Sequence, residues 1–363
     1  MNRLLLLALL ILSPLTRAEE KPQHLLYVTL PGIRNDLQYG GHGILVYDID
    51  QNFKLLKRIP TAGLDKAGKP NNVKGVCASA ATNRIYISTP TTLQAIDLLT
   101  EKLIWEKPFP GGCDRMSITP DSKAIYLPSF ESKHWNVVDP ISGDILATIT
   151  PNSGAHNTLV SLDGRYAYLA GLKSKDLAIA NAHEHKAVKT IPFTDHVRPF
   201  TVSGNGNTVY ACVDNLLGFE IGDVESGKLL QRMAVEGFKN GPVKRHGCPS
   251  HGIGLTPDEK QLWLCDAFNK RLHLFDLTTT PPKQVTSIQL KDEPGWITFT
   301  LDGKYAIPST GDIIDVASRK IITELKDETG RLVESEKVIE IHFAGGKPTQ
   351  VGNQFGVGRV LPK

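Results

Sequence analysis

The sequence lacks the short motifs that mark the commonest catalytic sites. It has no Gly-x-Ser-x-Gly nucleophile elbow, no His-Glu-x-x-His zinc motif, no phosphate-binding glycine-rich loop and no Cys-x-x-Cys-His haem attachment site. It also lacks the charge excess of a nucleic-acid-binding protein, because its formal net charge is only +3 over 363 residues. Function has to be sought in the arrangement of single residues.

Long hydrophobic runs are also missing. The apolar run at residues 4–12 is too short for a transmembrane helix, which needs about 20 residues. Arg3 precedes this run and Thr16-Arg17-Ala18 follows it, as in a secretory signal peptide with its cleavage site. We therefore predict a signal peptide at residues 1–18, a single mature domain at residues 19–363, no membrane span, and a periplasmic or secreted protein. An uncleaved anchor is the alternative.

Helical patterns of comparable length are absent, and short strands with turns between them recur along the chain. The segments 117–126 and 159–168 align residue for residue around a Pro-Asp or an Asp-Gly turn. The equivalent turn residues lie 40, 42, 42, 53 and 44 residues apart: Ala81, Asp121, Asp163, Asn205, Asp258 and Asp302. This period is typical of β-propellers, which have four strands in each blade.

The two ends of the chain supply one more blade. Residues 25–30, 44–49 and 53–59 have the pattern of second, third and fourth strands, and residues 338–343 have the pattern of a first strand. The sequence thus predicts an all-β, seven-bladed β-propeller. Its ring is closed by a C-terminal strand that completes the N-terminal blade and removes free sheet edges.

The repeats resemble a known family. Tyr27-Val28-Thr29, the Thr-Pro-Asp turns and the Asp-Gly-(Arg/Lys)-Tyr-Ala turns are similar to those of the YVTN family of seven-bladed propellers, which has lactonase-like and YncE-like members. The resemblance covers most of the mature chain and implies the propeller fold. It says less about function, because this fold supports enzymes, ligand-binding proteins and interaction scaffolds.

The repeat alignment separates core positions from candidate site positions. Five residues after each turn residue, and at Tyr27, the chain repeats large apolar residues, which predicts a packing role: Tyr86, Tyr126, Tyr168, Tyr210, Trp263 and Ile307. Just before each first strand, polar residue types vary from blade to blade. Because all first strands begin at one end of the channel, these residues should form a ring there.

The ring supplies the predicted site residues. We predict His156 and His251 as catalytic acid or base groups, because imidazole titrates near neutral pH. The predicted substrate-binding residues are Lys74, Asp114, Arg115, Asn157, Arg198, His246 and Trp296. Glu340 is a further candidate carboxylate. Polar channel mouths are common in propellers, so a purely structural role is the competing interpretation.

One long interval breaks the repeat. It inserts about ten residues near 236–250, a loop in which specificity often resides. The residues from Pro31 to Gly43 form another long connection on the same face. Cys248 in the insertion predicts a disulfide with Cys212 or Cys265, in a chain with five cysteines. A zinc or copper site at His246, Cys248 and His251 is the alternative, although we assign no metal ligand from the sequence.

The favoured function is binding, and possible conversion, of a small anionic molecule such as a sugar acid or lactone in the central funnel. An enzyme of this kind would be a lactonase-like hydrolase or a lyase; the cofactor is unknown, and a divalent metal is an option. We expect a monomer without a nucleic-acid partner. The alternative is a non-catalytic scaffold of the cell envelope that binds a partner through rim aromatics: Tyr39, Phe130, Trp135 and Phe268.

Overall fold

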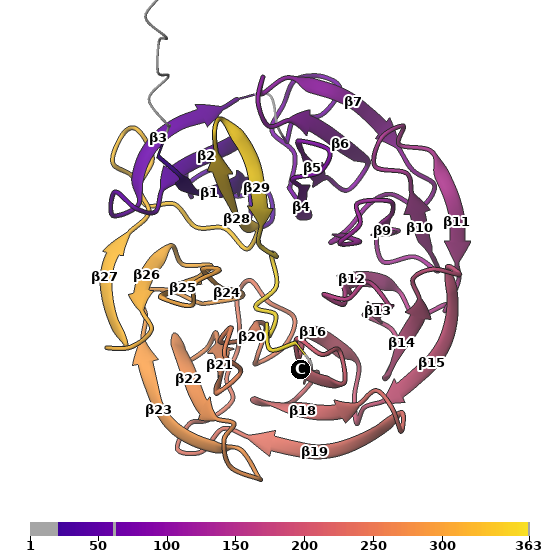
Figure 1. Ribbon diagram of the computed structural model, residues 1–363. Coiled ribbons are helices and arrows are strands. Elements are labelled where there is room, and N and C mark those ends of the chain that lie inside the picture. The colour runs from indigo at the N-terminus through magenta and orange to yellow at the C-terminus, as the bar shows by residue number, and fades with distance from the viewer. Residues whose placement is uncertain (1–20, 61–62, 362–363) are drawn as a thin grey trace, which may run out of the picture.

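The computed structural model describes residues 21–60 and 63–361 (Figure 1). The predicted signal peptide at residues 1–18 lies outside these ranges. Within them, the regular structure consists of β-strands joined by turns and loops. Nowhere in the same ranges does the chain form a helix with the length and hydropathy that a membrane crossing requires.

The strands of the described residues form seven antiparallel sheets, arranged as a ring around a central channel (Figure 1). Blade 1 contains β1 (Gln23–Leu30), β2 (Gly43–Asp48), β3 (Lys54–Ile59), β28 (Val338–Ala344) and β29 (Lys347–Val351). Blade 2 contains β4 (Gly75–Ser79), β5 (Arg84–Ser88), β6 (Thr92–Asp97) and β7 (Leu103–Pro108). Blade 3 contains β8 (Ser117–Ile118), β9 (Ile125–Pro128), β10 (Trp135–Val138) and β11 (Ile145–Ile149).

The other four blades have the same four-stranded plan. Blade 4 contains β12 (Ala155–Val160), β13 (Tyr166–Gly171), β14 (Asp176–Asn181) and β15 (Lys186–Pro192). Blade 5 contains β16 (Val197–Val202), β17 (Thr208–Val213), β18 (Gly218–Asp223) and β19 (Lys228–Ala234). Blade 6 contains β20 (Ile253–Leu255), β21 (Gln261–Asp266), β22 (Arg271–Asp276) and β23 (Lys283–Gln289); blade 7 contains β24 (Ile297–Phe299), β25 (Tyr305–Pro308), β26 (Asp312–Asp315) and β27 (Lys320–Glu324).

The predicted ring closure is confirmed. Strand β28 pairs with β1 in antiparallel register, with Val338 opposite Val28 and Phe343 opposite Gln23. The fourth strands consist mostly of exposed and half-buried residues, which alternate in β19, whereas the inner strands are almost entirely buried. This difference arises because the inner strands are covered by the neighbouring blades on both faces, whereas the fourth strands lie at the rim.

The repeated aromatic position is part of the core. Tyr86, Tyr126, Tyr168 and Trp263 are fully buried, Ile307 is 3% exposed, and only Tyr210 is half-buried. Three of the hydroxyls bond across to the next blade: Tyr86 donates to the carbonyl of Pro140, Tyr126 to that of Ala182, and Tyr168 to that of Gly206. These side chains therefore hold adjacent blades together, as the repeat alignment predicts.

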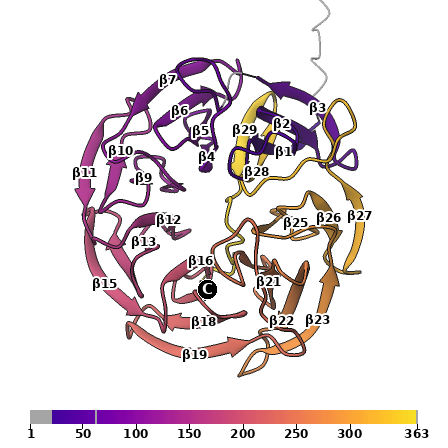
Figure 2. The same ribbon diagram turned by 180° about the vertical axis from the view of Figure 1, so that it is seen from behind.

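A C-terminal tail crosses the channel, which the repeat alignment does not predict. Strand β29 pairs with β28, and residues 352–361 then run across the middle of the ring in both views (Figures 1 and 2). Gln354 accepts a bond from the amide of Val76 and donates to the carbonyl of Met116. Phe355 packs between Phe200 and Trp296. The channel is thus divided by the tail.

We call the end of the channel at which the first strands begin the entry mouth, and the opposite end the exit mouth. The entry mouth carries Arg115, next to the Met116 carbonyl that Gln354 binds. The exit mouth carries the turns after the first strands, including Thr119 and Pro120. Because the tail lies between them, the two mouths are separate environments.

Candidate functional site

The predicted ring residues gather at the entry mouth in three connected groups. The side chains come from the segments that lead into first strands or, for His156, Asn157 and Arg198, from the beginning of those strands, so the ring brings segments of different blades to one axis. Solvent reaches some of these groups but not others: the side chains of Lys74, His156 and Arg198 are 15%, 13% and 16% exposed, whereas that of Asp114 is fully buried.

The first group is centred on Asp114. Its carboxylate accepts a hydrogen bond from His156 Nδ1 at 2.6 Å and lies 3.4 Å from the Lys74 ammonium. Burial would raise the pKa of Asp114, but the neighbouring His156 and Lys74 outweigh it and lower that pKa. Burial lowers the pKa of His156. A neutral His156 that donates through Nδ1 to an ionised Asp114 keeps a free lone pair on Nε2, as a general base requires.

The second group is centred on Arg115. Its Nη2 donates to Glu336 Oε2 at 2.8 Å, and its guanidinium lies 3.5 Å from the centre of the Trp296 ring. The same Glu336 oxygen accepts a bond from Lys337 Nζ at 2.7 Å. Burial would raise the pKa of Glu336, but Lys337 and Arg115 hold it well below its usual value. Burial lowers the pKa of Lys337 to about 7.

Asn157 lies beside Arg115, because the backbones of the two residues form a parallel bridge between blades 3 and 4. Its amide is fully buried, yet neither its nitrogen nor its oxygen has a hydrogen-bond partner among the described residues. Arg115 Nη1 is also buried without a partner in that part of the chain. Unpaired buried polar groups each cost about 1–3 kcal/mol, so a cluster of them marks a place where stability is sacrificed.

The third group lies on blade 5. Arg198 donates through Nε to Asp214, and the Nδ1 atom of His196 is 3.3 Å from the same carboxylate. Arg198 Nη2 also reaches the carbonyl of Gly247 in the insertion at 3.5 Å. Arg198 is therefore neutralised by Asp214 and contributes less free positive charge than the sequence suggests.

The insertion before β20 contacts the long connection of blade 1, which the sequence analysis places on the same face. Arg34 donates to the carbonyl of Arg245, and the guanidinium of Arg245 lies 4.7 Å from the centre of the Tyr39 ring. Arg245 also donates to Glu334 at 2.9 Å. The insertion places His246 against His251, with ring centres 4.9 Å apart and nearly parallel planes.

The disulfide between Cys248 and Cys212 or Cys265 is not formed, and all five cysteines are buried free thiols. The Cys248 thiol instead donates to the carbonyl of Ser250 at 3.0 Å. Burial raises the pKa of Cys248 and Cys265 well above the usual value of a thiol, which makes them poor nucleophiles.

Glu340 was placed at the wrong mouth by the repeat alignment. It accepts bonds from the Leu301 amide and from His342, and Leu301 lies in the turn at the exit mouth. The closing blade instead contributes Glu336 and Lys337, which the sequence analysis missed. Strand β28 is not followed by the turn residue that aligns the other repeats, so the alignment did not fix which residues of this blade lie at the entry mouth. The two positions directly before the start of β28 at residue 338 are those of Glu336 and Lys337.

The rim aromatics differ in exposure. Trp135 is fully buried and donates its indole N–H to Thr158, so it is unable to serve as an exposed contact. Phe130 and Phe268 are 38% and 42% exposed, and Tyr39 is half-buried against Arg245. Two exposed phenylalanines give weak support to the alternative in which the rim binds a protein partner.

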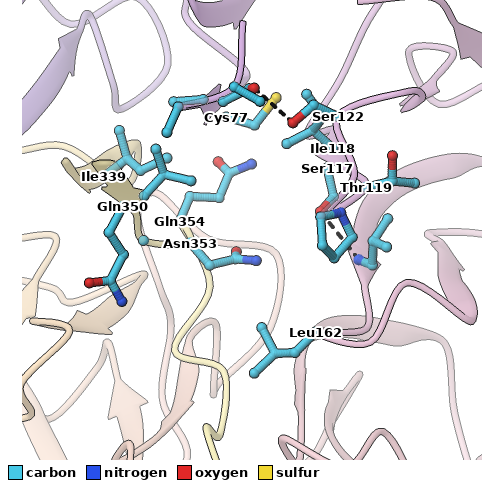
Figure 3. A pocket seen from close by; sticks show the side chains of 18 of the residues that line it. Cys77, Ser117, Ile118, Thr119, Ser122, Leu162, Ile339, Gln350, Asn353 and Gln354 are labelled. Atoms are coloured by element: carbon cyan, nitrogen blue, oxygen red, sulfur yellow. Dashed lines mark hydrogen bonds between the residues drawn. The ribbon is translucent and has the colours of Figure 1, made fainter. Parts of the chain in front are cut away.

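A cavity of about 420 Å³ lies at the exit mouth (Figure 3). Figure 3 shows Asn353 and Gln354 of the tail between Ile339 on one side and Ser117 on the other. Cys77 and Arg359 also line this cavity. The cavity contains none of the predicted site residues, so the exit mouth is a second candidate location for a ligand.

Comparison with known proteins adds little. No protein-family model matches the chain, and no curated protein sequence matches it. Among solved structures, it is similar to a chain of Kuenenia stuttgartiensis hydrazine synthase with a TM-score of 0.46 and 14% identity, over 70% of this chain and 95% of that one. The seven-bladed propeller therefore rests on the sheet order and ring closure described above.

Proposed function

We propose that this propeller binds a small hydroxy acid, such as a sugar acid or an opened lactone, at the entry mouth. The observation that carries the proposal is the buried Asn157 amide without a partner, on a residue whose backbone is bridged to that of Arg115, whose Nη1 atom is also unpaired among the described residues. A carboxylate would accept bonds from Arg115 Nη1 and Asn157 Nδ2, and an adjacent hydroxyl would donate to Asn157 Oδ1.

The neighbouring groups support the same ligand class. Lys74 and His156 are the parts of this site that solvent reaches, so a ligand meets them first and displaces their tips to reach Arg115. The Asp114–His156 pair supplies a base for activating water towards a lactone carbonyl, which is the chemistry of the lactonase-like relatives that the repeat motifs resemble. Lys74 would balance the carboxylate charge.

Asn157→Leu tests the binding site. The two side chains have similar volumes, and leucine removes two unsatisfied polar atoms, so the variant should be as stable as the parent or more stable. Calorimetric titration with D-gluconate and D-glucono-δ-lactone should show binding to the parent protein that falls at least tenfold in Asn157→Leu. Asn136→Leu is the matched control, because its buried amide nitrogen is also unpaired but lies on β10, away from the mouth.

Two further variants locate the ligand. His156→Gln should retain binding and lose any lactone hydrolysis, whereas Arg359→Gln at the exit cavity should change neither. Loss of binding in Arg359→Gln with full binding in Asn157→Leu would refute the entry mouth as the site. Absence of binding to the parent protein would refute the ligand class.

Export is also part of the proposal. We infer that residues 1–18 direct the chain to the periplasm or the medium, and N-terminal sequencing of the protein secreted by its native host should begin at Glu19.

A further inference from the structure

Two histidines and a carboxylate converge where the insertion before β20 meets the segment before β28. His246, His251 and Glu336 each present one ligand atom, and these atoms all lie within 4.8 Å of one another. Glu336 lies 90 and 85 residues after the two histidines in the sequence, and only the closure of the ring brings it to their imidazoles.

The hydrogen bonds around these groups leave His251 Nε2 and Glu336 Oε1 available as ligand atoms. His251 Nδ1 donates to the carbonyl of Gly295 at 3.1 Å, which fixes the ring and leaves Nε2 as the acceptor. Metal-binding histidines are usually held by such a backbone bond on the other nitrogen. Arg115 and Lys337 both bind Oε2 of Glu336, so Oε1 is left, 3.4 Å from His246 Nδ1.

His246 supplies a second, independent indication. Its ring is 2% exposed, and its Nε2 atom is buried without a hydrogen-bond partner in the described residues. The ring fits because residue 295 is glycine: a Cβ atom there would lie 1.9 Å from His246 Cε1. The fold thus makes room for an imidazole and then leaves one of its nitrogens unsatisfied.

We propose that His246, His251 and Glu336 bind a divalent transition-metal ion of the zinc class. Two imidazoles and one carboxylate form a ligand set of zinc sites that keep an open coordination position. Neutral imidazole also suits cobalt and nickel, whereas magnesium and calcium prefer oxygen ligands. Arg115 and Lys337 on Glu336 oppose a further positive charge, and buried Glu293 partly offsets them, so we expect micromolar rather than nanomolar affinity.

This site differs from the one that the sequence suggests, because Cys248 has no part in it. The Cys248 thiol donates to Ser250 and is protonated by burial. The metal site and the proposed hydroxy-acid site share the contact between Arg115 and Glu336, but none of the three metal ligands is Asn157 or His156, so variants of those two residues separate the sites.

The test uses the full mature chain, treated with a chelator and then dialysed against Zn²⁺ or Co²⁺. Elemental analysis should give one ion per chain, and bound Co²⁺ should show visible ligand-field absorption without a thiolate-to-cobalt charge-transfer band. His251→Ala and His246→Asn should each lower the affinity at least tenfold while the metal-free proteins keep their circular dichroism spectrum. Two variants are used so that the test does not depend on the folding of either one.

Two controls separate this site from others. His196→Ala should leave the stoichiometry unchanged, because His196 belongs to a half-exposed group with Asp195 and Asp214 that is the other candidate cluster among the described residues. Cys248→Ser should also leave the cobalt spectrum unchanged. Asn157→Leu should keep its metal, so that failure of the hydroxy-acid proposal and failure of this one are distinguishable.

Three results would overturn the proposal. They are absence of bound ion in the parent protein at submillimolar Zn²⁺, loss of the ion in His196→Ala with retention in His251→Ala, and a charge-transfer band that disappears in Cys248→Ser. Each of them shows that the two histidines and Glu336 are not the ligands.

Discussion

Phe355 anchors the tail that divides the channel, and Phe355→Ala tests whether the tail is part of the cooperative fold. Phe355 is 2% exposed, and its ring centre lies 6.2 Å from that of Phe200 and 5.3 Å from that of Trp296. Removing a buried phenylalanine ring costs about 3–5 kcal/mol when the surroundings are unable to collapse into the space. Blades on both sides of the tail are rigid sheets, so we expect a cost of about 4 kcal/mol.

The cost should be visible in thermal unfolding. The entropy of unfolding is about 2.1 cal/mol/K per residue, or about 0.8 kcal/mol/K for a chain of 363 residues. A loss of about 4 kcal/mol therefore lowers Tm by about 5 °C. Denaturant titration should show a lower midpoint with an unchanged slope, because the surface exposed on unfolding stays the same.

Val360→Ala is the matched control. Val360 lies on the same tail but is 50% exposed, so the substitution should change stability by less than about 0.5 kcal/mol. If Phe355→Ala falls within the same narrow range as Val360→Ala, the tail is not packed in the channel, and the separation of the two mouths is wrong.

Two other perturbations test the buried charges and the turns. Burial raises the pKa of Glu334 to about 7, above its ordinary value of 4.5, so its stabilising contribution is complete below pH 4.5 and is lost as the pH rises through about 7. Glu334→Gln keeps an acceptor for Arg245 and should remove as much as about 3 kcal/mol of this pH-dependent loss in the free energy of unfolding. The measurement is the denaturation midpoint from pH 4 to 8. A pH profile identical to that of the parent protein would contradict the assignment. Gly311 has φ of 75°, and a Cβ atom there would lie 2.0 Å from the carbonyl oxygen of Val333, so Gly311→Ala should lower Tm clearly more than Gly68→Ala, which has φ of 73° and open space. Equal effects of the two glycine substitutions would show that only backbone strain matters.

The sequence alone determined the architecture, because a propeller is built from local units. Six of the seven blades are runs of consecutive strands, and their turn residue and aromatic position recur at a nearly fixed spacing. Tyr126 and Trp263 are buried for the same local reason, so the repeat alone predicts them. Ring closure was predictable because an unpaired last strand and an incomplete first blade require each other.

The repeat alignment also predicted which residues of the candidate site lie close together. Lys74, Asp114 and His156 do form one connected group, because their positions are set by equivalent strand starts in blades 2, 3 and 4. Their protonation and pairing did not follow from spacing. Whether Arg198 is a free cation depends on Asp214, which lies in the turn after the second strand of its blade.

Only the tertiary structure decided what fills the channel and what meets across it. The tail after β29 has no repeat to align with, so its course depends on contacts such as those of Gln354 with Val76 and Met116. Glu336 reaches His246 and His251 across the ring, about 90 residues away in the sequence. Such non-local contacts arise from closure of the seven blades, and no local pattern encodes them.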